Sequence, residues 1–284
     1  RSRSRTGLLA AEAGLKYGNY LVVHGSPEMG LNTFRQVALD NEGTSVGMRA
    51  LLAAGQVAED LGHHSDAADS YWDILIADHD TGLSDQAVEG FSNSFFSIGA
   101  VGAESYYIAA KEDEGTNLSP YVRARVLHDY ALLIYSGQPE MTAMILELAL
   151  PDMLPGTDRD AAYFLLASIY RETGELHLAA DAYQIVASVS VPGGGRQAEA
   201  ELCSALILAK SNRRAMTANI LANVALRHPL EREIASEALY RAVEIMYSEG
   251  AERSAARLGD RLLQHYPGSA WAALLSDWRR QTPA

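Results

Sequence analysis

Three short stretches of the chain carry residue types that could do chemistry. His63 and His64 stand beside Asp66, but adjacent histidines point in different directions, and a metal site needs ligands that converge. The run Gly193-Gly-Gly195 would suit a phosphate loop, yet no strand pattern precedes it and no Lys-Ser/Thr follows it. Cys203 is the one cysteine, and its apolar helical surroundings predict a protonated core thiol. The motifs therefore predict no catalytic residue, no cofactor and no metal.

Asp158 and Asp160 resemble a pair of catalytic acids. They stand just before an apolar helical pattern, which is where aspartate commonly caps a helix. We expect one of them to be an N-cap, and we predict that the chain is not an enzyme.

Composition excludes several classes of function. The 284 residues carry a formal net charge of −13, which argues against nucleic-acid binding because neutralising phosphates requires a basic face. The longest apolar stretches, such as Ala143–Leu150, are much shorter than the roughly 20 residues of a membrane span. We expect a protein or peptide partner, no nucleic acid and no membrane-spanning segment.

The elements that must position any site are helices. Apolar residues recur with a helical period almost throughout, and breakers separate runs of roughly 12 residues. Breakers that recur between pairs of helices call for a search for repeats. They include His24-Gly-Ser-Pro27, Leu61-Gly-His-His-Ser65, Thr173-Gly-Glu175 and His265-Tyr-Pro-Gly-Ser269.

The stretch Asp160–Gly193 contains the clearest repeat unit. The unit begins with a helical stripe of Tyr163, Leu166, Ala167 and Tyr170. Gly174 follows as the turn glycine, and the second helix then carries a small residue, Ala179, and an aromatic, Tyr183. Residues at i, i+3, i+4 and i+7 share one helix face, and the small residues let two helices cross closely. Weaker copies in the same register span 11–44, 48–81 and 236–269, with Gly25, Gly62 and Gly250 at the place of Gly174.

This spacing resembles the tetratricopeptide repeat, a unit of about 34 residues. The resemblance implies an all-α fold, a right-handed solenoid of antiparallel helix pairs with about seven pairs and a C-terminal capping helix. Residues 1–10 are then a frayed or tag-derived terminus, 11–269 the solenoid, degenerate around 84–157, and 270–284 the capping helix and tail. Within the degenerate region we expect helices at 84–97 and 101–112 around Gly99.

In the resembling family, the first helices of successive repeats line a concave groove that holds a peptide or a partner helix. Carried over position by position, the resemblance implies ten groove residues: Asn19, Arg49, Gln56, Glu59, Phe164, Arg171, Glu237, Tyr240, Glu244 and Tyr247. Tyrosines are frequent binding anchors, which makes Tyr240 and Tyr247 the most suggestive pair. The alternatives are that these tyrosines pack against the capping helix and that Arg49 and Arg171 form ion pairs with neighbouring acids.

The sequence thus predicts a scaffold or adaptor that binds a partner in the concave groove. A self-assembling structural protein of the cell envelope is the alternative, and an enzyme on a helical solenoid is a third. The ending His265-Tyr-Pro-Gly-Ser-Ala270 and the excess of arginine over lysine resemble bacterial cell-envelope proteins of this family. We expect a periplasmic or envelope-associated protein, attached through a partner or through an N-terminal anchor outside this sequence, with a cytoplasmic location as the alternative.

Overall fold

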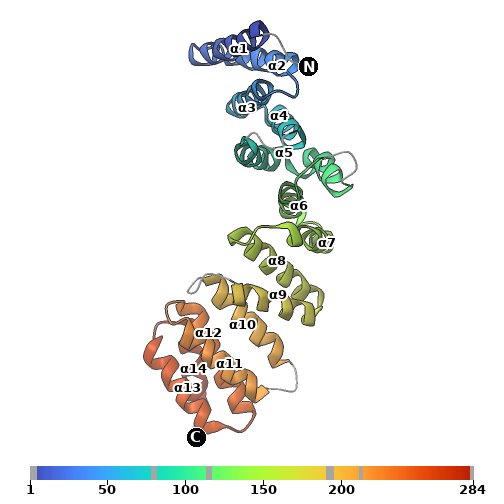
Figure 1. The fold of residues 1–284 in the computed structure, drawn as a ribbon. Helices are drawn as coiled ribbons and strands as arrows, with labels where there is room; N and C mark the ends of the chain where they lie inside the picture. Colours follow the sequence, from blue (N-terminus) through green and yellow to red (C-terminus); the bar gives the residue numbers. More distant parts are fainter. Residues whose placement is uncertain (1–4, 78–81, 113–116, 190–194, 211–213, 282–284) are drawn as a thin grey trace. The chain divides into compact units, whose positions relative to one another are not determined.

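The computed structural model describes residues 5–77, 82–112, 117–189, 195–210 and 214–281, and every regular element within them is helical (Figure 1). Contacts divide the chain into unit 1, residues 1–154, and unit 2, residues 155–284. The boundary falls inside the region that the sequence predicts to be degenerate. In the part of the chain that the structure describes, no helix is long and apolar enough to cross a membrane.

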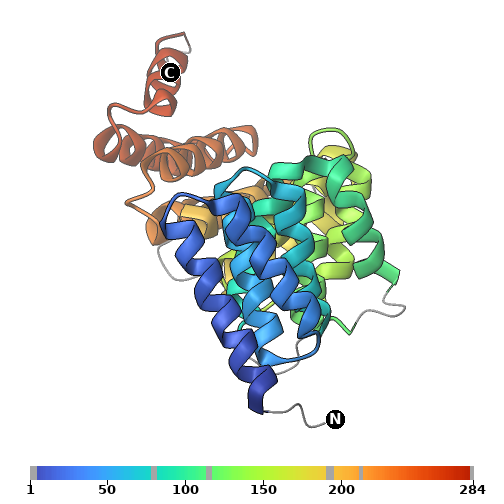
Figure 2. The same cartoon turned by 90° about the horizontal axis from the view of Figure 1, so that it is seen from above.

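Unit 1 consists of helices that pack on their neighbours in chain order, and α1 to α4 lie side by side in Figure 2. First helices of successive pairs also meet, α1 with α3 and α3 with α5, as the repeat resemblance implies. The elements are α1 (Arg5–Val23), α2 (Pro27–Asp40), α3 (Ser45–Asp60), α4 (His64–Ala77), α5 (Ser84–Glu112), α6 (Pro120–Ile134), α7 (Pro139–Ala149) and η1 (Leu150–Asp152).

Unit 2 repeats this arrangement and adds a single helix that packs on both α12 and α13. The elements are α8 (Thr157–Thr173), α9 (Leu176–Val189), α10 (Gly195–Ala209), α11 (Arg214–Arg227), α12 (Arg232–Ser248), α13 (Glu252–His265) and α14 (Ala270–Gln281). The expected capping helix is therefore confirmed as α14. Ser269 is its N-cap, because the Ser269 hydroxyl accepts a hydrogen bond from the backbone N–H of Ala272 at 3.1 Å.

The turn glycines confirm the register of the repeats. Gly25, Gly62, Gly174 and Gly250 all have φ between 75° and 89°, a left-handed conformation that glycine adopts at little cost. After each of them, the next backbone N–H donates to the carbonyl five residues earlier, as in Ser26 to Leu21 and Glu175 to Tyr170. These four first helices therefore end in the same way, and the following helix folds back along each of them.

Small residues and aromatics interlock inside helix pairs such as α3/α4 and α8/α9. Tyr71 of α4 is 1% exposed, and a Cβ built on Gly55 of α3 would lie 2.7 Å from its ring. Gly90 of α5 contacts the same ring from the next pair. In Asp160–Gly193, Ala167, Ala179 and Tyr183 are fully buried. The small residues at these positions therefore serve packing, as the spacing predicts.

The degenerate region follows the prediction of two helices around Gly99. Gly99 has φ 71° and ψ 177°, which interrupts α5 and separates residues 84–98 from residues 100–112. Counting these halves as one pair, the described residues form seven helix pairs followed by α14, an all-α fold of the tetratricopeptide type.

Two local predictions were wrong. The expected frayed terminus ended at residue 10, but α1 already begins at Arg5. Its first turns extend the helix that Ala11 and Leu15 anchor in the core, while Leu8 and Leu9 themselves stay exposed. An aspartate N-cap was expected before α8, but Gly156 occupies the N-cap position. Asp158 and Asp160 lie instead in the first turn, where their charges favourably oppose the helix dipole. Gly193 of the proposed glycine run lies outside the described residues.

Candidate functional site

In unit 1 the predicted groove residues largely contact other residues of the chain. Arg49 of α3 donates to the Glu12 carboxylate of α1 at 2.7 Å, so the ion-pair alternative is confirmed for Arg49. Glu59 accepts a hydrogen bond of 2.6 Å from the Tyr71 hydroxyl, which satisfies the polar end of that buried ring. Asn19 and Gln56 remain exposed. We call the exposed surface shared by the first helices α1 and α3 the first-helix face of unit 1. It carries two amide side chains and one ion pair.

In the Asp160–Gly193 repeat, the two predicted groove residues support the core. Phe164 lies edge-on to Tyr183 with ring centroids 5.3 Å apart. Arg171 of α8 reaches α10, where its Nη1 lies 3.6 Å from the Cys203 Sγ. Burial raises the pKa of the Cys203 thiol, and the nearby Arg171 only partly opposes this shift. The thiol is therefore a protonated core group and a poor nucleophile, as the sequence predicts.

In the last repeat the charged members of the stripe are linked by Arg241. Its guanidinium contacts Glu237 at 3.5 Å and Glu244 at 3.0 Å, and it lies 4.9 Å from the Trp271 ring. Tyr240 packs on Trp271 of α14 with centroids 5.2 Å apart. The alternative that this tyrosine packs against the capping helix is confirmed.

Tyr247 also meets the capping helix but retains an open side. Its ring lies 4.6 Å from the Trp278 ring in an edge-to-face arrangement, and the residue is 44% exposed. Tyr247 and Trp278 form walls of a cleft of about 520 Å³ between α12, α13 and α14, with Val243, Ala255 and Ala256 supplying apolar lining. We call this the C-terminal cleft. Its volume falls within the roughly 300–1,000 Å³ typical of ligand pockets.

The capping helix supplies one charge pair at the C-terminal cleft. Arg279 of α14 donates to Asp260 at 2.8 Å and to the Ala256 carbonyl at 3.1 Å. The guanidinium lies over Gly259, which stands where earlier repeats place Phe34, Tyr71 and Tyr183. A glycine at this position leaves room for the cap, so the last repeat differs from the others for a packing reason.

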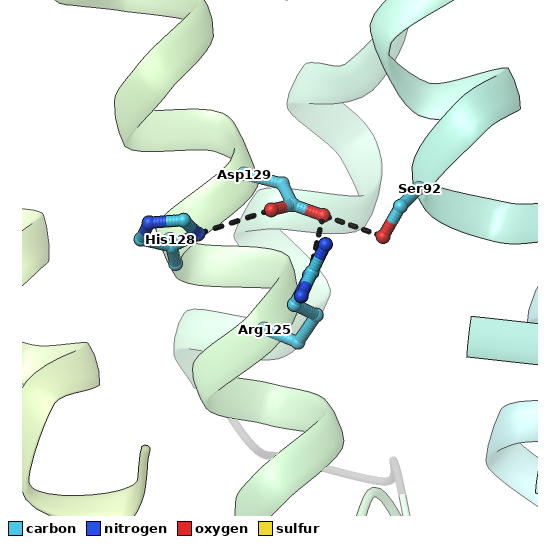
Figure 3. Close-up of polar contacts among 4 residues, drawn as sticks. All are labelled: Ser92, Arg125, His128 and Asp129. Carbon is cyan, nitrogen blue, oxygen red and sulfur yellow. Dashed lines mark hydrogen bonds and ion pairs between the residues drawn. The ribbon is translucent and has the colours of Figure 1, made fainter. Parts of the chain in front are cut away.

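A buried polar cluster in unit 1 was not predicted from the sequence (Figure 3). Asp129 of α6 is 1% exposed and accepts hydrogen bonds from Ser92 at 2.6 Å and from Arg125 at 3.1 Å. The Nδ1 atom of His128 lies 3.1 Å from the other carboxylate oxygen. In a hydrolytic triad the imidazole contacts the hydroxyl and the carboxylate orients the imidazole. Here the carboxylate contacts the hydroxyl directly, so His128 is not placed to take a proton from Ser92.

This cluster joins two helix pairs. Ser92 comes from α5 and the other three residues come from α6, so the Ser92–Asp129 hydrogen bond crosses the contact between these helices. Unit 2 contains a similar group, in which the buried Glu201 contacts His228 at 3.0 Å and Arg227 at 2.9 Å. In both groups the signal in the sequence was an acidic residue inside an apolar helical run, Asp129 in one and Glu201 in the other. Each of the two binds the partners given above.

A second cleft was also not predicted from the sequence. It lies between α2, α3 and α4 of unit 1, has a volume of about 730 Å³, and is called the acidic cleft because Glu42, Asp66, Asp69 and Asp73 line it. The available signal was the spacing of the three aspartates, which places them on one face of α4.

No metal site emerges within the described ranges, where no three His, Cys, Asp or Glu side chains converge as ligands. No protein-family model and no curated protein matches the chain.

Two solved structures align with the chain along most of its length. One comes from a functional characterization of Pseudomonas aeruginosa pilF, with 15% identity, 98% of this chain and 100% of that chain covered, and a TM-score of 0.40. The other is the TPR domain of P58(IPK), with 14% identity, coverage of 96% and 90%, and a TM-score of 0.25. The fold is defined instead by the chain's own repeats, whose turn glycines and buried small residues recur in one register.

Proposed function

We propose that this protein is an interaction scaffold that holds an apolar side chain of a partner protein in the C-terminal cleft. The observation that carries the proposal is the position of Tyr247, a predicted binding residue, on the open wall of that cleft beside Trp278. Aromatic residues dominate the energetics of protein interfaces because they bury a large area with few rotatable bonds.

The cleft has the composition of such a pocket. Val243 and Ala255 are buried and fix its apolar lining, so a partner side chain would meet a surface that does not need to rearrange. Glu252 and Arg253 supply polar groups to the lining, while Arg279 is held by Asp260. Preformed pockets bind more tightly because less conformational entropy is lost on association.

The first-helix face of unit 1 is the second candidate for a docking surface. Asn19 and Gln56 are exposed there, as the repeat resemblance implies for groove residues. The Arg49–Glu12 ion pair would have to open, or accept a third group, before either charge bound a partner. This cost is the reason for preferring the C-terminal cleft.

A displayed peptide library tests the proposal. Peptides selected on the full chain are measured against three variants, Tyr247→Ala, Gln56→Ala and, as a control, Tyr17→Ala, whose side chain is also exposed. Loss of a binding anchor of about 2 kcal/mol predicts roughly 30-fold weaker binding to Tyr247→Ala. If the selected peptides lose affinity only for Gln56→Ala, the first-helix face is the site, and if they bind all variants equally, both assignments fail.

Location in the cell envelope remains a further proposal, supported by the excess of arginine over lysine and by the ending around Tyr266 and Pro267. Fractionation of cells that express the protein from its natural gene tests it. Recovery in the periplasmic or envelope fraction is expected, and recovery in the cytosol alone would reject it.

A further inference from the structure

The acidic cleft of unit 1 has an apolar floor. Ala38 and Met48 are buried, Leu51 and Ile76 are half-buried, and Leu39 at the cleft is 71% exposed. Helix α3 turns Met48 and Leu51 toward this cleft, whereas Arg49 pairs with Glu12 of α1. The cleft is thus separate from the first-helix face, and it lies in a different unit from Tyr247.

Carboxylates gather around this floor from helix α4 and from the segment after α2. Asp66, Asp69 and Asp73 follow one stripe of α4, and Glu42 comes from the segment after α2. Among the described residues of the lining, Arg35 is the one basic side chain, and it is already paired with Asp66 at 2.8 Å. Asp69 accepts a hydrogen bond of 2.6 Å from Tyr106 of α5, which orients the carboxylate without neutralising it.

The remaining acids of the cleft repel one another. Enclosure by the cleft raises the pKa of Asp73, and the Asp69 and Glu42 carboxylates raise this pKa further. Within the described residues, neither Asp73 nor Glu42 forms an ion pair. Like charges at i and i+4 of a helix weaken it, so Asp69 and Asp73 lower the stability of α4 without a compensating cation.

From this geometry we infer that the acidic cleft docks a basic, amphipathic segment of a partner protein. One lysine or arginine would meet Asp73 and Glu42, and a neighbouring apolar side chain would cover Leu51 and Ile76. Charge complementarity identifies the partner, because four carboxylates face one arginine that is already engaged. Arginine fits best, since its planar guanidinium can bind two carboxylate oxygens at once.

Other occupants match the cleft less well. Among the described residues no three acidic or histidine side chains are arranged as metal ligands, which disfavours a bare divalent cation. A polyamine would satisfy the carboxylates, but it would leave the exposed Leu39 and the apolar floor uncovered. The inference does not depend on the proposed function of the C-terminal cleft, because the two clefts share no residue.

The test uses the full chain and a fluorescent synthetic peptide that contains two arginines flanked by leucines. We expect its binding, followed by anisotropy, to weaken about tenfold or more when Asp73→Asn and Glu42→Gln are combined. The matched control combines Asp85→Asn with Glu89→Gln, which removes the same charge from exposed positions on α5 of the same unit. Affinity should also fall as salt is raised from about 50 to 500 mM, because exposed charges are then screened.

A charge swap makes the test specific. The double variant D73K/E42K should no longer bind the arginine peptide, and it should bind a peptide in which glutamates replace the arginines. The inference is overturned if the Asp73/Glu42 variant binds the arginine peptide as tightly as the control variant does. It is also overturned if a peptide with serines in place of the leucines binds equally well, or if spermidine alone competes fully, because the cleft would then bind cations without its apolar floor. Tyr247→Ala should leave this binding unchanged, so failure here and failure of the proposed function are distinguishable.

Discussion

The acidic cleft and the C-terminal cleft are both formed where three successive helices meet, but they differ in how their charged side chains are paired. In the C-terminal cleft Arg279 of the cap neutralises Asp260, and its guanidinium occupies the space above Gly259. In the acidic cleft burial raises the pKa of Asp73, and the facing Asp69 and Glu42 carboxylates raise it further.

The difference follows from position in the array. The face of the last helix pair is covered by α14 rather than by another repeat. Helix α14 therefore supplies both the aromatic contacts and the arginine that neutralises the acid of the cleft. The acidic cleft lies beside helices that are already covered by their neighbours. Asp66 and Asp69 bind Arg35 and Tyr106 there, whereas Asp73 and Glu42 form no ion pair within the described residues. The charge pair of the C-terminal cleft therefore supports the cap and leaves an apolar wall for a partner, whereas the carboxylates of the acidic cleft would attract a basic one.

The largest expected effect concerns an acid that the fold needs. Asp129→Ala should destabilise unit 1 by about 3 kcal/mol, because it leaves the buried Ser92 hydroxyl and the Arg125 guanidinium without their acceptor. Hydrogen exchange of α5 and α6 in the full chain measures this loss. Asp85→Ala, at an exposed position on α5, should cost less than about 1 kcal/mol. Equal effects of the two substitutions would show that the buried cluster is not structural.

The next largest effect concerns the room that Gly259 leaves for the cap. Gly259→Tyr restores the aromatic found in earlier repeats and should cost about 2 kcal/mol, because the ring would displace Arg279 and Leu275. Faster hydrogen exchange of α14 is the expected signature. Gly268→Ala is the control, since no heavy atom lies within 4 Å of its added Cβ. Unchanged protection of α14 in Gly259→Tyr would contradict this account of the last repeat.

A smaller effect separates the paired arginine from its neighbour. Arg279→Ala should lower the stability of unit 2 by about 0.5–1 kcal/mol, through loss of the bonds to Asp260 and to the Ala256 carbonyl. Arg280 pairs with Asp277 three residues earlier and is 77% exposed, so Arg280→Ala should have a smaller effect. Denaturant unfolding of both variants gives the comparison, and a larger loss for Arg280→Ala would reverse it.

The smallest effect has the opposite sign. Asp73→Asn should stabilise unit 1 by about 0.3–0.5 kcal/mol at neutral pH, because it removes a like-charge pair on α4. The folded chain holds the Asp73 proton more tightly than the unfolded chain, whose carboxyl keeps its ordinary pKa of 3.8. Stability from this group is therefore lost as pH rises through the raised pKa, and the advantage of Asn should shrink as pH falls toward 4. Hydrogen exchange of α4 at several pH values measures it, with Glu89→Gln at an exposed position on α5 as the control.

The predictions from the sequence succeeded where the pattern is local to one repeat. Gly174, Ala179 and Tyr183 have the turn and packing roles that their spacing indicates, and Gly99 interrupts α5 as expected. The candidate groove residues were harder to interpret. Their positions on the first helices could be assigned from the repeat, but the contacts of Arg49, Arg171 and Tyr240 with other parts of the chain could not.

The sequence by itself thus determined the helix pairs, their turns and their register, because these depend on spacings of three, four and seven residues along one chain segment. Only the tertiary structure decided which side chains meet. Ser92 and Asp129 are 37 residues apart, and so are Glu12 and Arg49, yet each pair lies within hydrogen-bond distance. The acidic cleft likewise arises only when α2 and α4 pack on α3. Periodicity identifies the face of a helix that is buried, whereas the partner of each polar group depends on how successive helices cross.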